Sequence, residues 1–269
     1  MKITKWSSHD LAARTKQIKE AGPKAWGVKP RADDAELRRF AASEMRFGVV
    51  RFPGSCDEVD ALLACRRFAD AELLWHGDAD LRGVDAVVIP GGFSYGDYLR
   101  VGAIARFSPV MGAIEDFARS GGHVLGICNG FQVLCEAGLL PGALLPNTGL
   151  RFLCRQVGVE VVNPDTPFTS ACAPGDRLSI PVKHTTGRYY APPEVLEGLE
   201  AHGQIILRYA SKDNPNGSVA DIAAVSNGAR NVMGLMPHPE HAVDPLTGST
   251  DGGRLFESLA RHVAERLPA

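Results

Sequence analysis

Residues 123–138 read HVLGICNGFQVLCEAG and contain a cysteine at the point where an apolar run gives way to a helical pattern. The run from His123 to Cys128 predicts a buried strand, and the apolar residues that follow indicate a helix ending at Gly138. The pentapeptide Gly126-Ile127-Cys128-Asn129-Gly130 has the G-x-C-x-G form of a nucleophile elbow, with cysteine where hydrolases have serine. This stretch therefore predicts a strand–turn–helix unit and favours an α/β fold.

The glycines of the elbow have a mechanical role. Positions without a Cβ on both sides of Cys128 relieve crowding in a sharp turn and let the nucleophile adopt a strained conformation. The N-terminus of the following helix presents free N–H groups to the sulfur, which favours a thiolate. A lone cysteine is usually buried and inert, but strand, elbow and helix together favour a catalytic role for Cys128.

The alternation of short branched apolar runs with helical stretches continues through the rest of the chain. It predicts an α/β domain with an open, mainly parallel sheet flanked by helices and a strand-rich later half. The expected strands are 47–52, 73–75, 85–89, 123–128, 152–162, 178–182, 205–209, 222–226 and 232–236. The expected helices are 57–69, 103–119, one from about 131 that ends at Gly138, and 253–266.

Composition narrows the possible functions. The chain has 269 residues, 45% of them hydrophobic and 22% charged, with a formal net charge of −2. This balance gives no overall electrostatic reason to expect nucleic-acid or membrane binding. No apolar run reaches the roughly 18 residues of a membrane span, and no secretory signal is evident, so we expect a cytoplasmic protein. The six cysteines lack zinc-site spacing and disulfide density, which indicates reduced thiols.

Residues 1–44 differ in charge from the rest. They carry ten Lys or Arg and six Asp or Glu, a net of +4, which leaves −6 for residues 45–269 when the whole chain carries −2. Ser7 and Asp33 are suited to cap two short helices. The segment is interpreted as a loosely ordered extension, an upstream start before Met45, or a docking appendage. We therefore predict an N-terminal extension, 1–44, and one domain, 45–269.

A second motif, Met236-Pro237-His238-Pro239-Glu240, follows an apolar strand. Pro239 favours an extended His238, so the side chains of His238 and Glu240 can project to one side. His238 can then act as acid and base while Glu240 orients the ring. A surface His–Glu contact is the structural alternative. Metal binding through His238 and His241 is another, which the prolines disfavour because that spacing normally works on a helix.

A third motif, Pro90-Gly91-Gly92-Phe93-Ser94-Tyr95-Gly96-Asp97, follows the strand that ends at Ile89. Gly92 can bring its N–H close to a developing oxyanion, and the N–H of Asn129 is the natural second donor. A turn that merely needs glycine is the structural alternative. A phosphate-binding loop is disfavoured, because the motif lacks a Gly-Lys-Ser/Thr ending.

In order and type these motifs resemble those of the class I glutamine amidotransferases, in which a cysteine elbow is followed much later by a His-Pro-Glu triplet. More narrowly, they are similar to the glutaminase subunits of phosphoribosylformylglycinamidine synthases, over about residues 45–269. The stretches concerned are 91–98 (GGFSYGDY), 126–132 (GICNGFQ), 214–218 (NPNGS) and 236–240 (MPHPE). The GGFSYGD stretch discriminates, because related amidotransferases generally have Gly-Pro-Gly in that loop.

The resemblance implies a flavodoxin-like fold and a chain that releases ammonia from glutamine. The ammonia would serve an ATP-dependent synthetase that converts phosphoribosylformylglycinamide in de novo purine synthesis. The implied roles are nucleophile for Cys128, acid/base for His238, orienting carboxylate for Glu240, oxyanion donors for Gly92 and Asn129, and glutamine contact for Gln132. For Gln132, a solvated or cap-region helix residue is the alternative. No metal or organic cofactor is implied on this chain, since ATP and magnesium serve the synthetase.

The implied partners are glutamine and a large synthetase subunit, with or without a small accessory subunit. Free ammonia would protonate and diffuse away, so we expect a tunnel-forming interface around the elbow. The loop from Phe93 to Arg100 is the predicted docking surface, because Tyr95, Tyr98 and Arg100 are residue types favoured in binding hot spots. A self-packed active-site loop is the alternative.

Two positions depart from the family pattern. His184-Thr185-Thr186-Gly187 stands where relatives tend to have His-Gly-Glu-Gly, and His241 stands where arginine is frequent. Three other functions stay open: a glutaminase subunit for a different synthetase, a cysteine hydrolase or stress protein, and a catalytically silent regulatory subunit. The second is disfavoured because such proteins keep a histidine close behind the cysteine, whereas the next one here is His184.

Overall fold

The computed structural model describes residues 45–210 and 212–266. The predictions for residues 1–44, including the two short helices, lie outside these described residues. Among the helices of the described ranges, none is long and apolar enough to cross a membrane.

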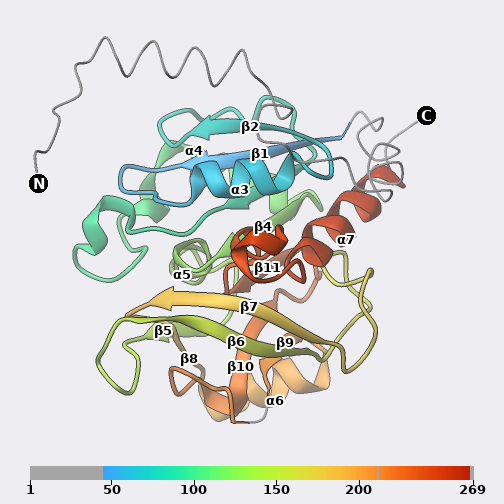
Figure 1. Cartoon of the computed structure of the whole chain (residues 1–269). Helices are drawn as coiled ribbons and strands as arrows, with labels where there is room; N and C mark the ends of the chain where they lie inside the picture. Colours follow the sequence, from blue (N-terminus) through green and yellow to red (C-terminus); the bar gives the residue numbers. More distant parts are fainter. Residues whose placement is uncertain (1–44, 211, 267–269) are drawn as a thin grey trace, which may run out of the picture. The chain divides into compact units, whose positions relative to one another are not determined.

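Nine strands form one sheet in the order β2-β1-β3-β4-β11-β10-β9-β6-β7 (Figure 1). Strands β2 to β11 in this order run parallel, and the pairs from β11 to β7 are antiparallel. The strands are β1 (Arg46–Arg51), β2 (Asp70–Trp75), β3 (Ala86–Ile89), β4 (His123–Ile127), β6 (Leu153–Val161), β7 (Arg177–His184), β9 (Ile205–Tyr209), β10 (Ile222–Ser226) and β11 (Val232–Leu235). A separate antiparallel pair consists of β5 (Ala143–Leu145) and β8 (Arg188–Tyr190). The predicted α/β class, with its strand-rich later half, is confirmed.

Burial of the strands follows from their place in the sheet. Every residue of β3 and β4 is buried, as expected for central parallel strands that helices cover on both faces. Along the edge strand β7, by contrast, buried positions alternate with more accessible ones, because one face of this antiparallel strand is open.

Five helices are described: α3 (Glu58–Cys65), α4 (Pro109–Arg119), α5 (Asn129–Glu136), α6 (Pro193–Ala201) and α7 (Gly253–Ala264). The unit β1–α3–β2 runs one way along the sheet, whereas β3–α4–β4 runs the other way, and α5 packs against β3, β4 and β11. Right-handed crossovers therefore put α3 and α4 on opposite faces of the sheet. Helix α7 packs beside α3, where the Phe68 and Phe256 rings stack with centroids 6.3 Å apart.

Four helix and strand predictions need correction. The helix expected over 103–119 begins at Pro109, because proline suits the first helical position and holds Ser108 extended at ψ 142°. The helix expected over 57–69 ends at Cys65. Helix α6 was missed, and its only buried residue is Leu199, so the sequence carries little apolar periodicity there. The short pair β5 and β8 was also missed.

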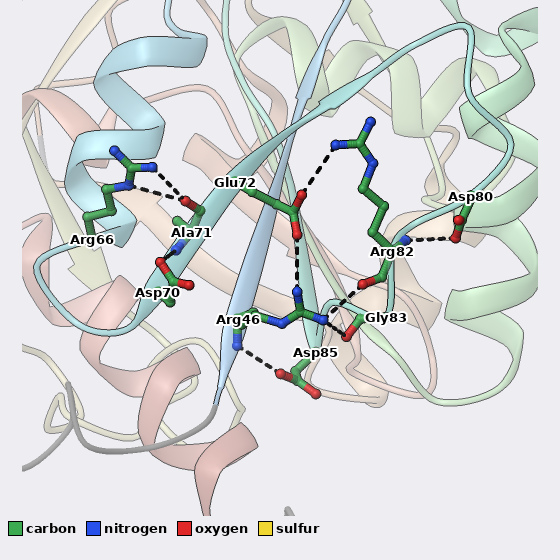
Figure 2. Close-up of polar contacts among 9 residues, drawn as sticks. All are labelled: Arg46, Arg66, Asp70, Ala71, Glu72, Asp80, Arg82, Gly83 and Asp85. Carbon is green, nitrogen blue, oxygen red and sulfur yellow. Dashed lines mark hydrogen bonds and ion pairs between the residues drawn. The ribbon is translucent and has the colours of Figure 1, made fainter.

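Hydrogen bonds from Arg46 hold the amino ends of β1 and β3 together (Figure 2). The backbone N–H of Arg46 donates to Oδ2 of Asp85 at 2.8 Å. The Arg46 guanidinium donates to the carbonyl oxygens of Arg82 and Gly83 at 2.9 and 3.0 Å, and to Glu72 at 3.3 Å. Because Asp85 immediately precedes β3, these contacts fix the start of β1 against the start of β3.

The carboxyl ends of the parallel strands β1, β3, β4 and β11 lie together at the opposite end of these strands. Ile89 of β3 is paired with Gly126 of β4, and Ile127 is paired with Leu235 of β11, so these strands end at one level. The direction of strand order reverses between β1 and β3. In open α/β sheets ligands bind at this switch point. The loops after β1, β3, β4 and β11 therefore converge on one place.

Candidate active site

Cys128 sits between β4 and α5 in a strained backbone conformation, with φ 50° and ψ −100°. Its side chain is 5% exposed. A Cβ on Gly130 would collide with the carbonyl oxygen of Ile89, and one on Gly126 would lie 2.8 Å from the carbonyl oxygen of Gly130. The predicted elbow and the mechanical need for its two glycines are confirmed.

His238 and Glu240 form a close buried pair. Nδ1 of His238 lies 2.6 Å from Oε1 of Glu240, and the two residues are 1% and 3% exposed. Glu240 belongs to the short 3₁₀ turn Pro239–His241, and His238 is non-helical just before it, at φ −104° and ψ 87°. The backbone N–H of His238 also donates to the carbonyl of Pro181 in β7 at 2.8 Å. The predicted projection of both side chains to one side is confirmed.

One pocket brings Cys128, His238 and Gly92 together, although they come from three different loops. Nε2 of His238 is buried and has no hydrogen-bond partner in the described part of the chain. Burial disfavours the charged ring, but the Glu240 carboxylate and the Cys128 sulfur outweigh burial and raise the pKa of His238 to about 10. At neutral pH the ring is therefore an imidazolium, stabilised by the Glu240 carboxylate on one side and by the Cys128 sulfur on the other.

Gly92 and Asn129 have backbone N–H groups without a partner among the described residues. Gly92 has φ 145°, and a Cβ there would lie 2.6 Å from the backbone nitrogen of Cys56. The flanking bonds from Phe93 N–H to the Gly54 carbonyl (2.8 Å) and from Cys56 N–H to the Gly91 carbonyl (3.3 Å) fix the loop. Both predicted oxyanion donors are thus available.

Gln132 is buried one helical turn after the cysteine, and its side-chain amide is engaged. Its Oε1 accepts from Nδ2 of Asn129 at 3.0 Å, and its Nε2 donates to the carbonyl of Thr186 at 2.5 Å. The Asn129 side chain in turn accepts from the N–H of Ser94 at 3.2 Å. Gln132 lines the pocket. The bonds of Gln132 and Asn129 also join α5 to two loops, the one that contains Ser94 and the one that contains Thr186.

The Asn214–Ser218 motif supports the loop at 184–187. Nδ2 of Asn216 donates to the carbonyl of Gly187 at 2.8 Å and to the Tyr209 hydroxyl at 3.1 Å. Nδ1 of His184 lies 3.0 Å from Oδ1 of Asn147. Burial lowers the pKa of His184 to about 4, and the charge on His238 adds to the effect. His184 is therefore neutral at pH 7.

Sequence reasoning missed a buried carboxylate, Asp57, that joins this site. Its Oδ2 lies 3.6 Å from Nδ1 of His238, its Oδ1 lies 3.3 Å from Nε2 of His241, and Lys183 of β7 forms an ion pair with it. Burial alone would raise the pKa of Asp57, but the His241 hydrogen bond, the His238 charge and Lys183 hold it well below its usual range. Asp57 is the N-cap residue just before α3, after β1, so its strand-to-helix position was the available signal. Lys183 carries no such signal.

Asp57, His238, Glu240 and His241 place possible metal-ligand atoms within 4.8 Å of one another. The Lys183 ammonium pairs with the Asp57 carboxylate at the same place, and a cation already present opposes the binding of a metal ion. The Asp57 pairing also raises the pKa of Lys183, although burial acts in the opposite direction. The donor set therefore fits a protein-internal charge network better than a metal centre.

The fold and the elbow beside a His–Glu pair define a known class. The chain matches the family model of the CobB/CobQ-like glutamine amidotransferase domain over residues 44–258. Fold, site and match together make this chain a glutamine amidotransferase by class.

Individual relatives narrow the family. A protein of Rubrobacter xylanophilus, named phosphoribosylformylglycinamidine synthase subunit PurQ, is 62% identical over 216 residues, 80% of this chain and 97% of the relative. One of the same name from Frankia casuarinae is 58% identical over 221 residues, 81% and 94% of the two chains. A chain in the solved structure of PurLQS from Thermotoga maritima matches with a TM-score of 0.75 and 42% identity, covering 81% of this chain and 99% of that one. This chain belongs to the PurQ family.

Proposed function

We propose that this chain is the glutaminase subunit of phosphoribosylformylglycinamidine synthase and supplies ammonia for de novo purine biosynthesis. The observation that carries the proposal is the buried Cys128 at positive φ beside a His238–Glu240 pair separated by 2.6 Å. Membership of the PurQ family and the likeness to PurLQS support the choice of acceptor. A cytoplasmic location is part of this proposal.

Cys128 acts as the nucleophile. His238 interacts with the sulfur, and an adjacent histidine activates a cysteine as a nucleophile. The sulfur attacks the side-chain amide carbon of glutamine and forms a carbon–sulfur bond. The carbonyl oxygen becomes an oxyanion, which accepts hydrogen bonds from the N–H groups of Gly92 and Asn129.

His238 moves the protons of both half-reactions. It donates a proton to the amide nitrogen as the carbon–nitrogen bond breaks, and ammonia leaves a glutamyl thioester on Cys128. The neutral ring then accepts a proton from water, which attacks the thioester and releases glutamate with return of the thiolate. Glu240 keeps Nδ1 oriented throughout, so that Nε2 faces the reacting atoms.

The proposal requires no metal or organic cofactor on this chain, and ATP and magnesium serve the synthetase. The partner is the large synthetase subunit, with or without a small accessory subunit. Tyr98 and Leu99 are 74% and 90% exposed in the loop that follows Gly92, and Phe152 beside the pocket is 52% exposed. These apolar side chains form the docking surface that we propose. Arg100, which the sequence placed in the same loop, is 73% exposed on its side chain and pairs with Glu136 at 2.6 Å, and its docking role stays a prediction.

The test measures glutamate release by the purified chain, wild type and Cys128→Ala, with and without the synthetase, ATP and phosphoribosylformylglycinamide. We expect Cys128-dependent release that rises with the synthetase and yields the amidine product. Release without that product would show a glutaminase for a different acceptor. No Cys128-dependent release in the full mixture would contradict the proposal and leave a silent subunit.

A further inference from the structure

Asp97 supplies a carboxylate to the pocket that neither the elbow nor the His–Glu pair uses. It lies at the end of the short 3₁₀ turn Ser94–Asp97 and lines the same pocket as Cys128. Its φ is 56°, in the left-handed region that non-glycine residues rarely adopt. The neighbouring Tyr95 hydroxyl is 2.9 Å from both Nδ1 of His76 and Oγ of Ser108. The loop therefore holds Asp97 in place.

The Asp97 carboxylate lacks a partner inside the described chain. Its Oδ1 is buried and makes no hydrogen bond there. Burial raises the pKa of Asp97 to about 6, so the group is mainly ionised at pH 7. Asp97 as a whole is half-buried, and an unpaired carboxylate that is partly withdrawn from water is destabilised unless a cation or a donor meets it. This position is therefore suited to a positively charged ligand group.

The other charged groups of the pocket are already paired. The Asp57 carboxylate faces Lys183, and the charge of His238 faces Glu240. The loop opposite contributes Thr185 and Thr186, which are uncharged, and the neutral His184. Asp97 is thus the unpaired anion among the described residues that line the pocket.

Glutamine brings a cation to this pocket when its amide carbon lies at the Cys128 sulfur. Its α-carbon carries an ammonium group and a carboxylate, and an unpaired anion attracts the first and repels the second. The Gln132 side chain is an uncharged amide, and its bonds to Asn129 and Thr186 already engage it. We propose that Asp97 binds the α-ammonium group of the glutamine substrate and selects an α-amino acid over other amides. This inference rests on the proposed glutaminase function.

The test compares two substrates and two enzymes, in complex with the synthetase. Glutaramate has the same chain as glutamine but lacks the α-amino group. For wild type we expect kcat/KM to favour glutamine over glutaramate by about 30- to 100-fold, as for a buried charged hydrogen bond. In Asp97→Asn the glutamine value should fall by about that factor, chiefly through KM, while the glutaramate value changes less than about threefold.

Turnover of glutaramate by Asp97→Asn shows that the variant is folded and that the nucleophile is intact. Asp116→Asn, at an 80% exposed side chain of α4, is the matched control and should leave both values unchanged. Equal losses for both substrates, or an unchanged preference for glutamine, would overturn the inference while leaving the glutaminase function standing. Wild-type enzyme that releases no glutamate from glutamine would instead contradict the proposed function.

Discussion

Asp57 places a carboxylate oxygen 3.6 Å from Nδ1 of His238, the same ring nitrogen that Glu240 contacts at 2.6 Å. Two carboxylates therefore face one edge of the ring. Asp57 is neutralised by Lys183 and contacts His241, so the second carboxylate belongs to a network that crosses from α3 to β7.

We predict that Asp57 and Lys183 are strongly coupled in stability. Removing one member of a buried ion pair leaves the other charge uncompensated, whereas removing both can be nearly neutral. Asp57→Asn and Lys183→Met should each cost about 2 kcal/mol of unfolding free energy, a figure reduced from fully buried pairs because Lys183 is 31% exposed on its side chain. The double variant should lose less than the sum, as measured by chemical denaturation. Strict additivity would exclude the coupling.

The strained backbone of Cys128 predicts a stability difference between two inactive variants. Glycine tolerates φ 50° and ψ −100°, whereas alanine keeps the strain. Cys128→Gly should therefore be more stable than Cys128→Ala by about 1 kcal/mol in thermal or chemical unfolding. The matched control is Cys135 in the same helix, where glycine should be less stable than alanine by about 0.5–1 kcal/mol. The same ranking at both positions would show that Cys128 is unstrained.

His184 predicts a loss of stability in mild acid. Its pKa is about 4 in the folded chain against about 6.5 unfolded, so the unfolded chain binds a proton first as pH falls. This contribution is fully present above pH 6.5 and is lost by up to about 1.4 kcal/mol per pH unit toward pH 4. In His184→Gln the unfolding free energy should depend less steeply on pH over that window. An unchanged slope would contradict the prediction.

The proposed docking surface predicts weaker association when its apolar side chains are removed. Tyr98→Ala with Leu99→Ser should weaken binding to the synthetase by about tenfold or more, because tyrosine is enriched in binding hot spots and the exposed leucine beside it adds apolar area to the contact. The unfolding temperature should hardly change, since both side chains are largely exposed. Leu246→Ser, at a residue 90% exposed on another loop, serves as the control. Association equal to that of wild type would refute this surface.

Part of the fold and site was predictable because it is encoded locally. The run before Cys128, the elbow glycines and the buried helix after it are adjacent in sequence, and the structure has them as β4, a turn at positive φ and α5. His238 and Glu240 are two residues apart, and the proline between them limits their conformation. Helix α6 and the β5–β8 pair escaped prediction because short elements with few buried residues leave little periodicity.

The sequence by itself thus determined the residue types of the chemistry and the short elements that carry them, through patterns only a few residues long. Tertiary structure alone decided which distant groups meet. Asp57 joins Lys183 and His241 across 126 and 184 residues of chain, and Asp97 faces the pocket without a partner. These contacts depend on strand order and register, which bring the carboxyl ends of β1, β3, β4 and β11 together at one end of the sheet. No local sequence pattern specifies strand order or register.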